Sequence, residues 1–167
     1  MKIAVFVDVQ NIYYTTRDAF GRAFDYRKFW RIINEQGEII IANAYAIQRQ
    51  DYSGINDSQI KFQDALKHIG FDVKLKPYIQ RSDGSAKGDW DVGITIDVMK
   101  ASQLGIDKVV LLSGDGDFDR LLMTIKNDFN VTTEVYGVEE LTAKSLIDMA
   151  DNFVPIVPSL LINKFSE

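Results

Sequence analysis

Residues 109–119 read VVLLSGDGDFD, and this stretch joins a predicted strand to a group of acidic side chains. The four apolar residues 109–112 are typical of a buried parallel strand, which the following serine and glycine end. Three aspartates then occupy alternate positions: Asp115, Asp117 and Asp119. The chain next enters the apolar, helix-like run 121–125. Because ligands bind at the carboxyl ends of strands in open α/β sheets, the stretch predicts an α/β fold with a site at this turn.

The spacing of these aspartates supports two interpretations. Carboxylates this close together repel one another unless protons or a cation neutralise them, which favours a metal site. Oxygen ligands without histidine or cysteine suit Mg²⁺ or Mn²⁺ rather than zinc. The alternative is a turn rich in Asp and Gly whose aspartates only cap the next helix.

The composition indicates a single globular domain over residues 1–167, of which 46% are hydrophobic. The absence of cysteine excludes disulfides, thiolate metal sites and cysteine nucleophiles. A formal net charge of -5 argues against a strong non-specific nucleic-acid binder. It leaves open an enzyme that acts on nucleic acid through metal ions and a local basic patch.

The first residues, Met1 to Asp8, lack the apolar length of a signal peptide. No apolar run approaches the roughly 20 residues that span a bilayer. We therefore expect a cytoplasmic protein with no membrane contact. An exposed sheet edge could support a homodimer, although no segment of the sequence identifies one.

Strands alternate with helices along the whole chain. The predicted strands cover residues 3–7, 39–47, 71–79, 108–112, 131–136 and 153–157. The predicted helices cover 13–20, the segment between Asp25 and Gly37, 58–69, 89–104, 118–129 and 141–150. Residues 49–57 and 80–88 are predicted loops, and Pro77 favours an edge position for the third strand. This rhythm predicts a Rossmann-like, three-layer α/β/α fold with a mainly parallel sheet.

Two further polar residues follow the first predicted strand. Asp8 ends that strand, and the first and fourth strands of such sheets are commonly neighbours. Asp8 could therefore face Asp115 across one crevice, or it could cap the following helix. Asn11 has the spacing to turn its amide toward the same crevice, or it is a plain turn residue.

The helix predicted over 89–104 begins with further aspartates. One of Asp89 and Asp91 caps this helix, and Asp91, in its first turn, could instead point into the crevice. Asp97 lies about 240° around the helix from Asp91, so one helix cannot aim both at one ion. We therefore expect a structural role for Asp97.

Two groups of side chains could contact a nucleic acid. Tyr13, Tyr14 and Arg17 could supply stacking and phosphate contacts, although a half-buried amphipathic helix explains them equally well. The clearest basic cluster comprises Lys74, Lys76, Tyr78, Arg81 and Lys87. Scattered surface lysines are the usual explanation of such a cluster.

Several enzyme classes lack their motifs. Residues 114–119 are not a G-x-G-x-x-G loop, and no P-loop is present. Gln10 stands where an aspartyl-phosphate phosphatase would have a second aspartate. The single histidine, His68, has no G-x-S-x-G partner, which disfavours a Ser-His-Asp hydrolase.

Taken together, four segments resemble the NYN domain of the PIN-like nuclease superfamily, close to its bacterial LabA-like branch. They are FVDVQN at 6–11, KGDWDVGITID at 87–97, LSGDGDF at 112–118 and MADNF at 149–153. One departure is Gly116, where serine is the commoner residue in the family. We expect this change to leave metal binding intact.

The resemblance implies metal-dependent hydrolysis of RNA phosphodiester bonds, with Mg²⁺ or Mn²⁺ as cofactor. By that resemblance Asp8, Asp91 and Asp115 are the main acidic positions. Asn11 matches a family amide, and Asp117 and Asp119 match accessory carboxylates. The residues expected to contact the RNA are Tyr13, Arg17, Lys87 and Ser113. The alternatives are a catalytically silent RNA-binding or regulatory module and, less favoured, a small-molecule phosphohydrolase.

Overall fold

The computed structural model describes residues 1–48, 50–51, 54–55, 57–77, 79–80, 86–87 and 89–163. Its main sheet has six strands in the order β10-β9-β8-β1-β2-β5, and all neighbours are parallel. The strands are β1 (Lys2–Asp8), β2 (Glu38–Gln48), β5 (Asp72–Pro77), β8 (Lys108–Leu112), β9 (Thr132–Gly137) and β10 (Asn152–Pro155). The predicted parallel sheet is confirmed, with β1 beside β8 and β5 at one edge.

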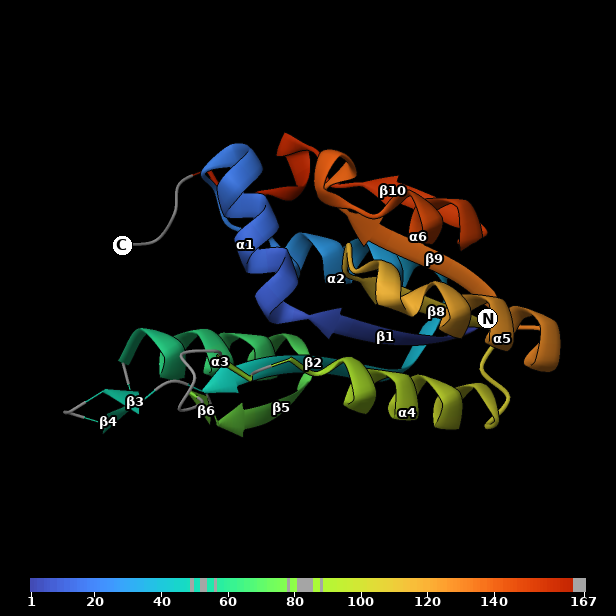
Figure 1. Cartoon of the computed structure of the whole chain (residues 1–167), viewed down its shortest axis with the longest axis horizontal. Coiled ribbons are helices and arrows are strands. Elements are labelled where there is room, and N and C mark those ends of the chain that lie inside the picture. The colour runs from blue at the N-terminus through green and yellow to red at the C-terminus, as the bar shows by residue number, and fades with distance from the viewer. Residues whose placement is uncertain are drawn as a thin grey trace.

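Helices cover both faces of this sheet (Figure 1). They are α1 (Val9–Phe20), α2 (Tyr26–Gln36), α3 (Asp57–Ile69), α4 (Asp91–Ser102), α5 (Asp119–Phe129) and α6 (Lys144–Met149). Single 3-10 turns form η1 (Gly116–Phe118), η2 (Glu139–Leu141) and η3 (Pro158–Leu160). Side chains from α1, α2 and α3 pack in one core cluster, and those from α4, α5 and α6 pack in the other. The three-layer α/β/α architecture is therefore as predicted.

The central strand β1 explains why its sequence is continuously apolar. Residues 3–7 are all fully buried, and their side chains alternate between the two core clusters. Val5 and Val7 face α1 and α2, whereas Ala4 and Phe6 face α4 and α5. A strand covered on both faces has no solvent side on which to carry polar residues.

Two short antiparallel ladders lie in or beside the predicted loops, and β5 ends at Pro77, two residues before the end of the strand predicted over 71–79. β3 (Gln50–Asp51) pairs with β4 (Gly54–Ile55), and β6 (Ile79–Gln80) pairs with β7 (Ala86–Lys87). The side chains of Tyr78, Arg81 and Lys87 lie outside the described residues, so most of the predicted basic cluster has no structural account.

Side-chain caps set where two helices begin. The Asp8 carboxylate accepts a hydrogen bond from the Asn11 amide at 3.4 Å, so α1 begins at Val9 rather than at Tyr13. Asp25 caps α2 in the predicted way, since its Oδ1 accepts from the Lys28 amide at 3.0 Å. The first of these caps ties the end of β1 directly to α1.

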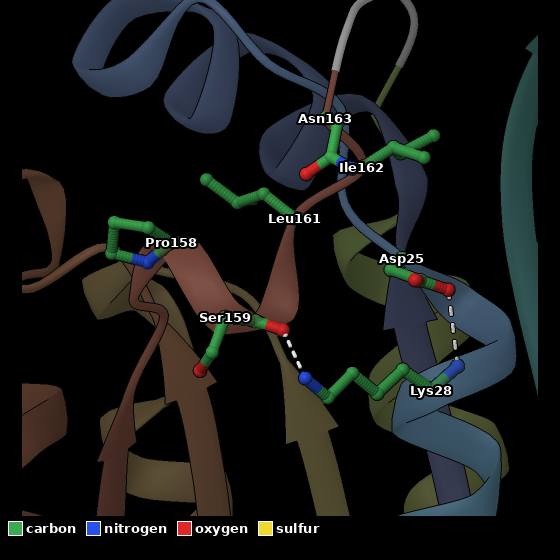
Figure 2. Close-up of a pocket in the computed structure, with 7 residues that line it drawn as sticks. All are labelled: Asp25, Lys28, Pro158, Ser159, Leu161, Ile162 and Asn163. Atoms are coloured by element: carbon green, nitrogen blue, oxygen red, sulfur yellow. Dashed lines mark hydrogen bonds between the residues drawn. The ribbon is translucent and has the colours of Figure 1, made fainter.

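The C-terminal segment packs against the start of α2. Leu161 pairs with Phe24 in an antiparallel bridge, and the Lys28 Nζ donates to the Ser159 carbonyl at 2.6 Å (Figure 2). A hollow of about 330 Å³ lies between the two segments. None of the predicted site aspartates lines this hollow. Among the described residues, no helix has the length and apolar character needed to cross a membrane.

Candidate metal centre

Three aspartates meet at the carboxyl edge of the sheet. One carboxylate oxygen from each of Asp91, Asp115 and Asp117 lies within 4.8 Å of the other two. Asp91 is the first residue of α4, and the other two belong to the turn after β8. Oxygen ligands of Mg²⁺ lie about 2.1 Å from the ion, so opposite ligands are about 4.2 Å apart. The three oxygens are therefore close enough to share one divalent ion.

The turn that carries Asp115 and Asp117 is held by hydrogen bonds. Asp115 Oδ1 accepts from the Asp117 amide at 2.9 Å, which forms the cap of η1. The Asn11 Oδ1 accepts from the Gly114 amide at 2.8 Å. Asn11 therefore links α1 to this turn and fixes its path beside the end of β1.

Asp8 lies next to the three clustered aspartates but is not one of that group. Its Oδ2 accepts from the Ser113 Oγ at 3.1 Å, and the same Oγ accepts from the Asp115 amide at 3.2 Å. Ser113 is fully buried. Its hydroxyl therefore connects the two acidic segments instead of facing solvent.

Burial and mutual repulsion both act on these carboxylates. Burial, with a smaller contribution from the charge of Asp115, raises the pKa of Asp8 to about 6. Burial again, followed by the charge and hydrogen bonding of Asp115, raises the pKa of Asp91 to about 7. Within the described part of the chain, none of Asp8, Asp91, Asp115 and Asp117 has an ion pair with a basic side chain. A cation would relieve this repulsion, and an all-carboxylate donor set fits Mg²⁺ or Mn²⁺.

Contacts around Trp90 place the first turn of α4 at the edge of the sheet. The Trp90 indole Nε1 donates to the Ala46 carbonyl of β2 at 2.9 Å. Lys76 Nζ lies 4.6 Å from the Trp90 ring centroid and donates to the Asp89 carbonyl at 2.9 Å. A Cβ at Gly93 would lie 2.7 Å from the same ring, so glycine allows the indole to pack over the helix. These contacts determine where the neighbouring Asp91 lies.

The sequence model of the NYN domain family matches residues 2–160. The chain belongs to the NYN domain family. This family falls within the PIN-like nuclease superfamily. The predicted family resemblance is therefore confirmed.

Two relatives of this NYN domain are similar to it over most of its length. It is 29% identical over 163 residues to the "Low amplitude and bright protein LabA" of Synechococcus elongatus, a match that covers 93% of this chain and 83% of LabA. The crystal structure of VPA0982, a protein of unknown function from Vibrio parahaemolyticus, is 49% identical, with a TM-score of 0.88. That match covers 96% of both chains. The fold thus recurs in a solved relative over nearly its full length.

Gly116 is the position at which the resemblance to the family led us to expect serine. A Cβ at Gly116 would lie 2.8 Å from the Ala143 Cβ, so a serine would require Ala143 to move. The close approach of the segment before α6 to the acidic turn thus explains the glycine.

Other residues singled out in the sequence do not belong to this group of three carboxylates. Asp119 Oδ1 accepts from the Arg120 amide at 2.6 Å, and Asp119 does not belong to the group of three. Asp97 accepts from the Tyr45 hydroxyl at 2.7 Å, in agreement with its expected structural role. Tyr13 and Arg17 line a groove on the α1 side of Asp8.

Two residues of this groove were not identified from the sequence. Tyr26 and Gln63 line it, and both side chains are buried. Tyr26 directly follows the residue that caps α2. In the sequence it looks like an ordinary aromatic residue of the core. Gln63 carried a usable signal, because it occupies the buried stripe of α3 three residues before Leu66, where an apolar residue is expected.

Proposed function

We propose that this NYN domain is a metal-dependent endoribonuclease that hydrolyses RNA phosphodiester bonds with Mg²⁺ or Mn²⁺. The observation that carries the proposal is the meeting of the Asp91, Asp115 and Asp117 carboxylates within 4.8 Å at the carboxyl edge of the sheet. Membership of a nuclease superfamily supports the same reaction class.

In this proposal Asp91, Asp115 and Asp117 hold the ion. A bound divalent ion supplies an activated water and offsets charge on the scissile phosphate. Asp8 acts beside them, either as a further ligand or as the acceptor that orients Ser113 and, through it, the Asp115 segment.

Supporting residues complete the proposed site. Asn11 keeps the acidic turn in place through the Gly114 amide. Tyr13 and Arg17 contact the RNA on the α1 side, and Lys87 contacts it from the segment before α4. The buried Ser113 is reassigned from substrate contact to positioning. Asp119 has the least support as a ligand because its carboxylate is bonded to the Arg120 amide.

The test is cleavage of labelled single-stranded and hairpin RNA with Mn²⁺, with Mg²⁺ and with excess chelator. We expect Asp91→Asn and Asp115→Asn each to lower the rate more than about 100-fold, since even the partners of metal ligands commonly account for 10- to 100-fold. Asp128→Asn, an exposed carboxylate on α5, is the matched control and should cleave normally. Cleavage at the wild-type rate by both site variants would assign the activity elsewhere.

A second candidate is a catalytically silent RNA-binding or regulatory module. The net charge of -5 favours its regulatory form, since strong non-specific nucleic-acid binders are usually basic. Calorimetric titration with Mn²⁺ separates the two functions. Metal binding that Asp115→Asn removes, together with metal-dependent cleavage, supports the nuclease. The same binding without cleavage of any RNA supports the silent module.

A further inference from the structure

A groove of about 560 Å³ lies between α1 and α3, at the carboxyl end of β2. Its walls are mostly apolar and aromatic, with Val9, Phe62 and Ala46 among the lining residues. Its volume is within the range of sites that hold small organic ligands or parts of larger ones.

Two buried polar side chains line this groove without a protein partner. Gln63 is 7% exposed and Tyr26 is 8% exposed. Among the described residues, neither the Gln63 amide nor the Tyr26 hydroxyl has a hydrogen-bond partner, and neither is sealed from solvent. In the free protein, water can hydrogen-bond to these atoms. A ligand that displaces this water must supply hydrogen bonds of its own, since leaving the groups buried and unpaired would cost about 1–3 kcal/mol each.

The rim of the groove presents aromatic faces and a cation. The rings of Tyr13 and Tyr14 lie 5.3 Å apart, and the Arg17 guanidinium carbon is 4.9 Å from the Tyr14 ring centroid. Tyr13 is 47% exposed. Aromatic faces beside arginine form the surfaces on which unpaired nucleic-acid bases stack.

The groove begins at the residues that follow Asp8. Val9 and Gln10, which line the groove, follow Asp8 directly in the sequence. Burial raises the pKa of the Tyr26 hydroxyl, and the charge of Asp8 raises it further. Figure 1 shows α1 leaving the carboxyl end of β1, the edge at which the aspartates meet.

We propose that this groove binds one nucleobase of a single-stranded RNA whose backbone crosses the aspartate cluster, with Gln63 and Tyr26 hydrogen-bonding to the edge of the base. The inference rests on the proposed function, because it takes RNA as the ligand. A base fits the observations better than an apolar peptide side chain, which would leave the amide and the hydroxyl unpaired.

The test measures RNA binding without cleavage, by fluorescence anisotropy in the presence of chelator. The probes are labelled ten-nucleotide homopolymers of each of the four bases and an otherwise identical abasic strand. The variants are Gln63→Leu and Tyr26→Phe, and the matched control is Gln103→Leu at the exposed end of α4.

We expect at least one homopolymer to bind about tenfold more tightly than the abasic strand, and Gln63→Leu to remove most of that difference. Tyr26→Phe should lower the same affinity about threefold or more, and Gln103→Leu should leave it unchanged. Thermal melting should show Gln63→Leu at least as stable as wild type, because leucine leaves no buried amide unpaired.

Equal binding of the abasic strand, or wild-type affinity in Gln63→Leu, would overturn the inference. Concentration-dependent dimerisation that Phe62→Asp abolishes would also overturn it, because a second copy would then occupy the groove. Cleavage is scored separately. If the protein cleaves RNA normally but shows no base preference, only the proposal for the groove fails. If binding depends on the base but no metal supports cleavage, only the proposed nuclease function fails.

Discussion

The two ends of β8 carry buried charge in opposite ways. At the start of the strand, Lys108 Nζ lies 2.7 Å from Glu134 Oε2, with side chains 11% and 5% exposed. Gln36 Oε1 accepts from the same Nζ at 2.7 Å, and Asn152 donates to Glu134 Oε2 at 3.0 Å. After the end of the strand, the charged groups that the Asp115 carboxylate meets among the described residues are other carboxylates, and it has no ion pair there with a basic side chain.

The first region is neutralised by its own side chains, and the second is not. The Lys108 side chain tolerates burial because an oppositely charged side chain and polar hydrogen-bond partners are buried with it. Around Asp115 no such cation is present among the described residues, and burial, followed by the charge of Asp115, raises the pKa of Asp91 to about 7. The charge at the start of β8 is therefore neutralised within the protein, whereas the carboxylates beyond its end offer a site that a cation would neutralise. Matched substitutions should thus change stability in opposite directions at the two ends.

The largest effect is expected from breaking the neutral region. Lys108→Met should lower the free energy of unfolding by about 3–5 kcal/mol, because it leaves the Glu134 carboxylate buried without its cation. Glu134 Oε1 already has no hydrogen-bond partner among the described residues, which adds to the cost. Urea denaturation measures the change, with Lys100→Met at an exposed position of α4 as control.

A double variant tests the cause of that loss. Lys108→Met with Glu134→Leu should regain much of the lost stability, since apolar replacement of a buried pair is often neutral. If Lys108→Met lost less than about 1 kcal/mol of unfolding free energy, the Lys108–Glu134 pair would behave as a solvent-exposed ion pair.

The opposite sign is expected at the acidic cluster. Without metal at pH 7.5, Asp8→Asn should raise the free energy of unfolding by about 1–2 kcal/mol. A pKa of about 6 against an unfolded value near 3.9 sets an upper limit of about 3 kcal/mol, and the weakened bond to Ser113 reduces it. Melting temperatures with and without Mn²⁺ test this, and the metal should stabilise the variant less than wild type. A destabilised metal-free variant would mean that the cap on α1 outweighs the buried charge.

Much of this comparison could be predicted from the sequence. The apolar runs of β1 and β8 indicated neighbouring parallel strands. Asp8 ends β1 and Asp115 follows β8 by three residues, so this topology brings the two aspartates near each other. The start of α1 was predicted four residues late, because the pattern of apolar residues carries no information about the Asp8 cap.

The finer arrangement of the aspartates could not be predicted. Asp117 joins Asp91 and Asp115 because the chain makes the 3-10 turn η1 before α5, and periodicity alone does not reveal such a turn. The orientation of Asp8 depends on Ser113, a contact between residues 105 positions apart. Long-range hydrogen bonds of this kind leave no local pattern.

A pH titration sharpens the comparison in a single molecule. The folded protein retains protons on Asp8 and Asp91 up to pKa values of about 6 and about 7, whereas the unfolded chain releases them near 3.9. The folded state thus binds more protons, so the stability of the metal-free protein should fall between pH 5 and pH 7.5. Asp8 alone contributes about 1.4 kcal/mol to this fall, and the more exposed Asp91 adds a further, solvent-screened contribution.

Two controls accompany this titration. Asp8→Asn should make the fall of stability with pH less steep. Saturating Mn²⁺ should turn this fall into a rise, because the metal binds the ionised carboxylates. The pKa of Asp151 is lowered, so this group titrates below pH 5. It should leave the slope of stability against pH unchanged between pH 5 and pH 7.5. A rise in metal-free stability across the same pH range would contradict the raised pKa values.

The smallest effect is expected at the boundary of the acidic cluster. Asp117 contributes an oxygen to the group of three, whereas Asp119, two residues later, directs its carboxylate to the Arg120 amide. Asp117→Asn should therefore weaken Mn²⁺ binding about tenfold, and Asp119→Asn should change it less than about twofold. Calorimetric titration compares the two directly. Equal losses would mean that the first turn of α5 opens when metal binds, which would extend the unneutralised region into that helix.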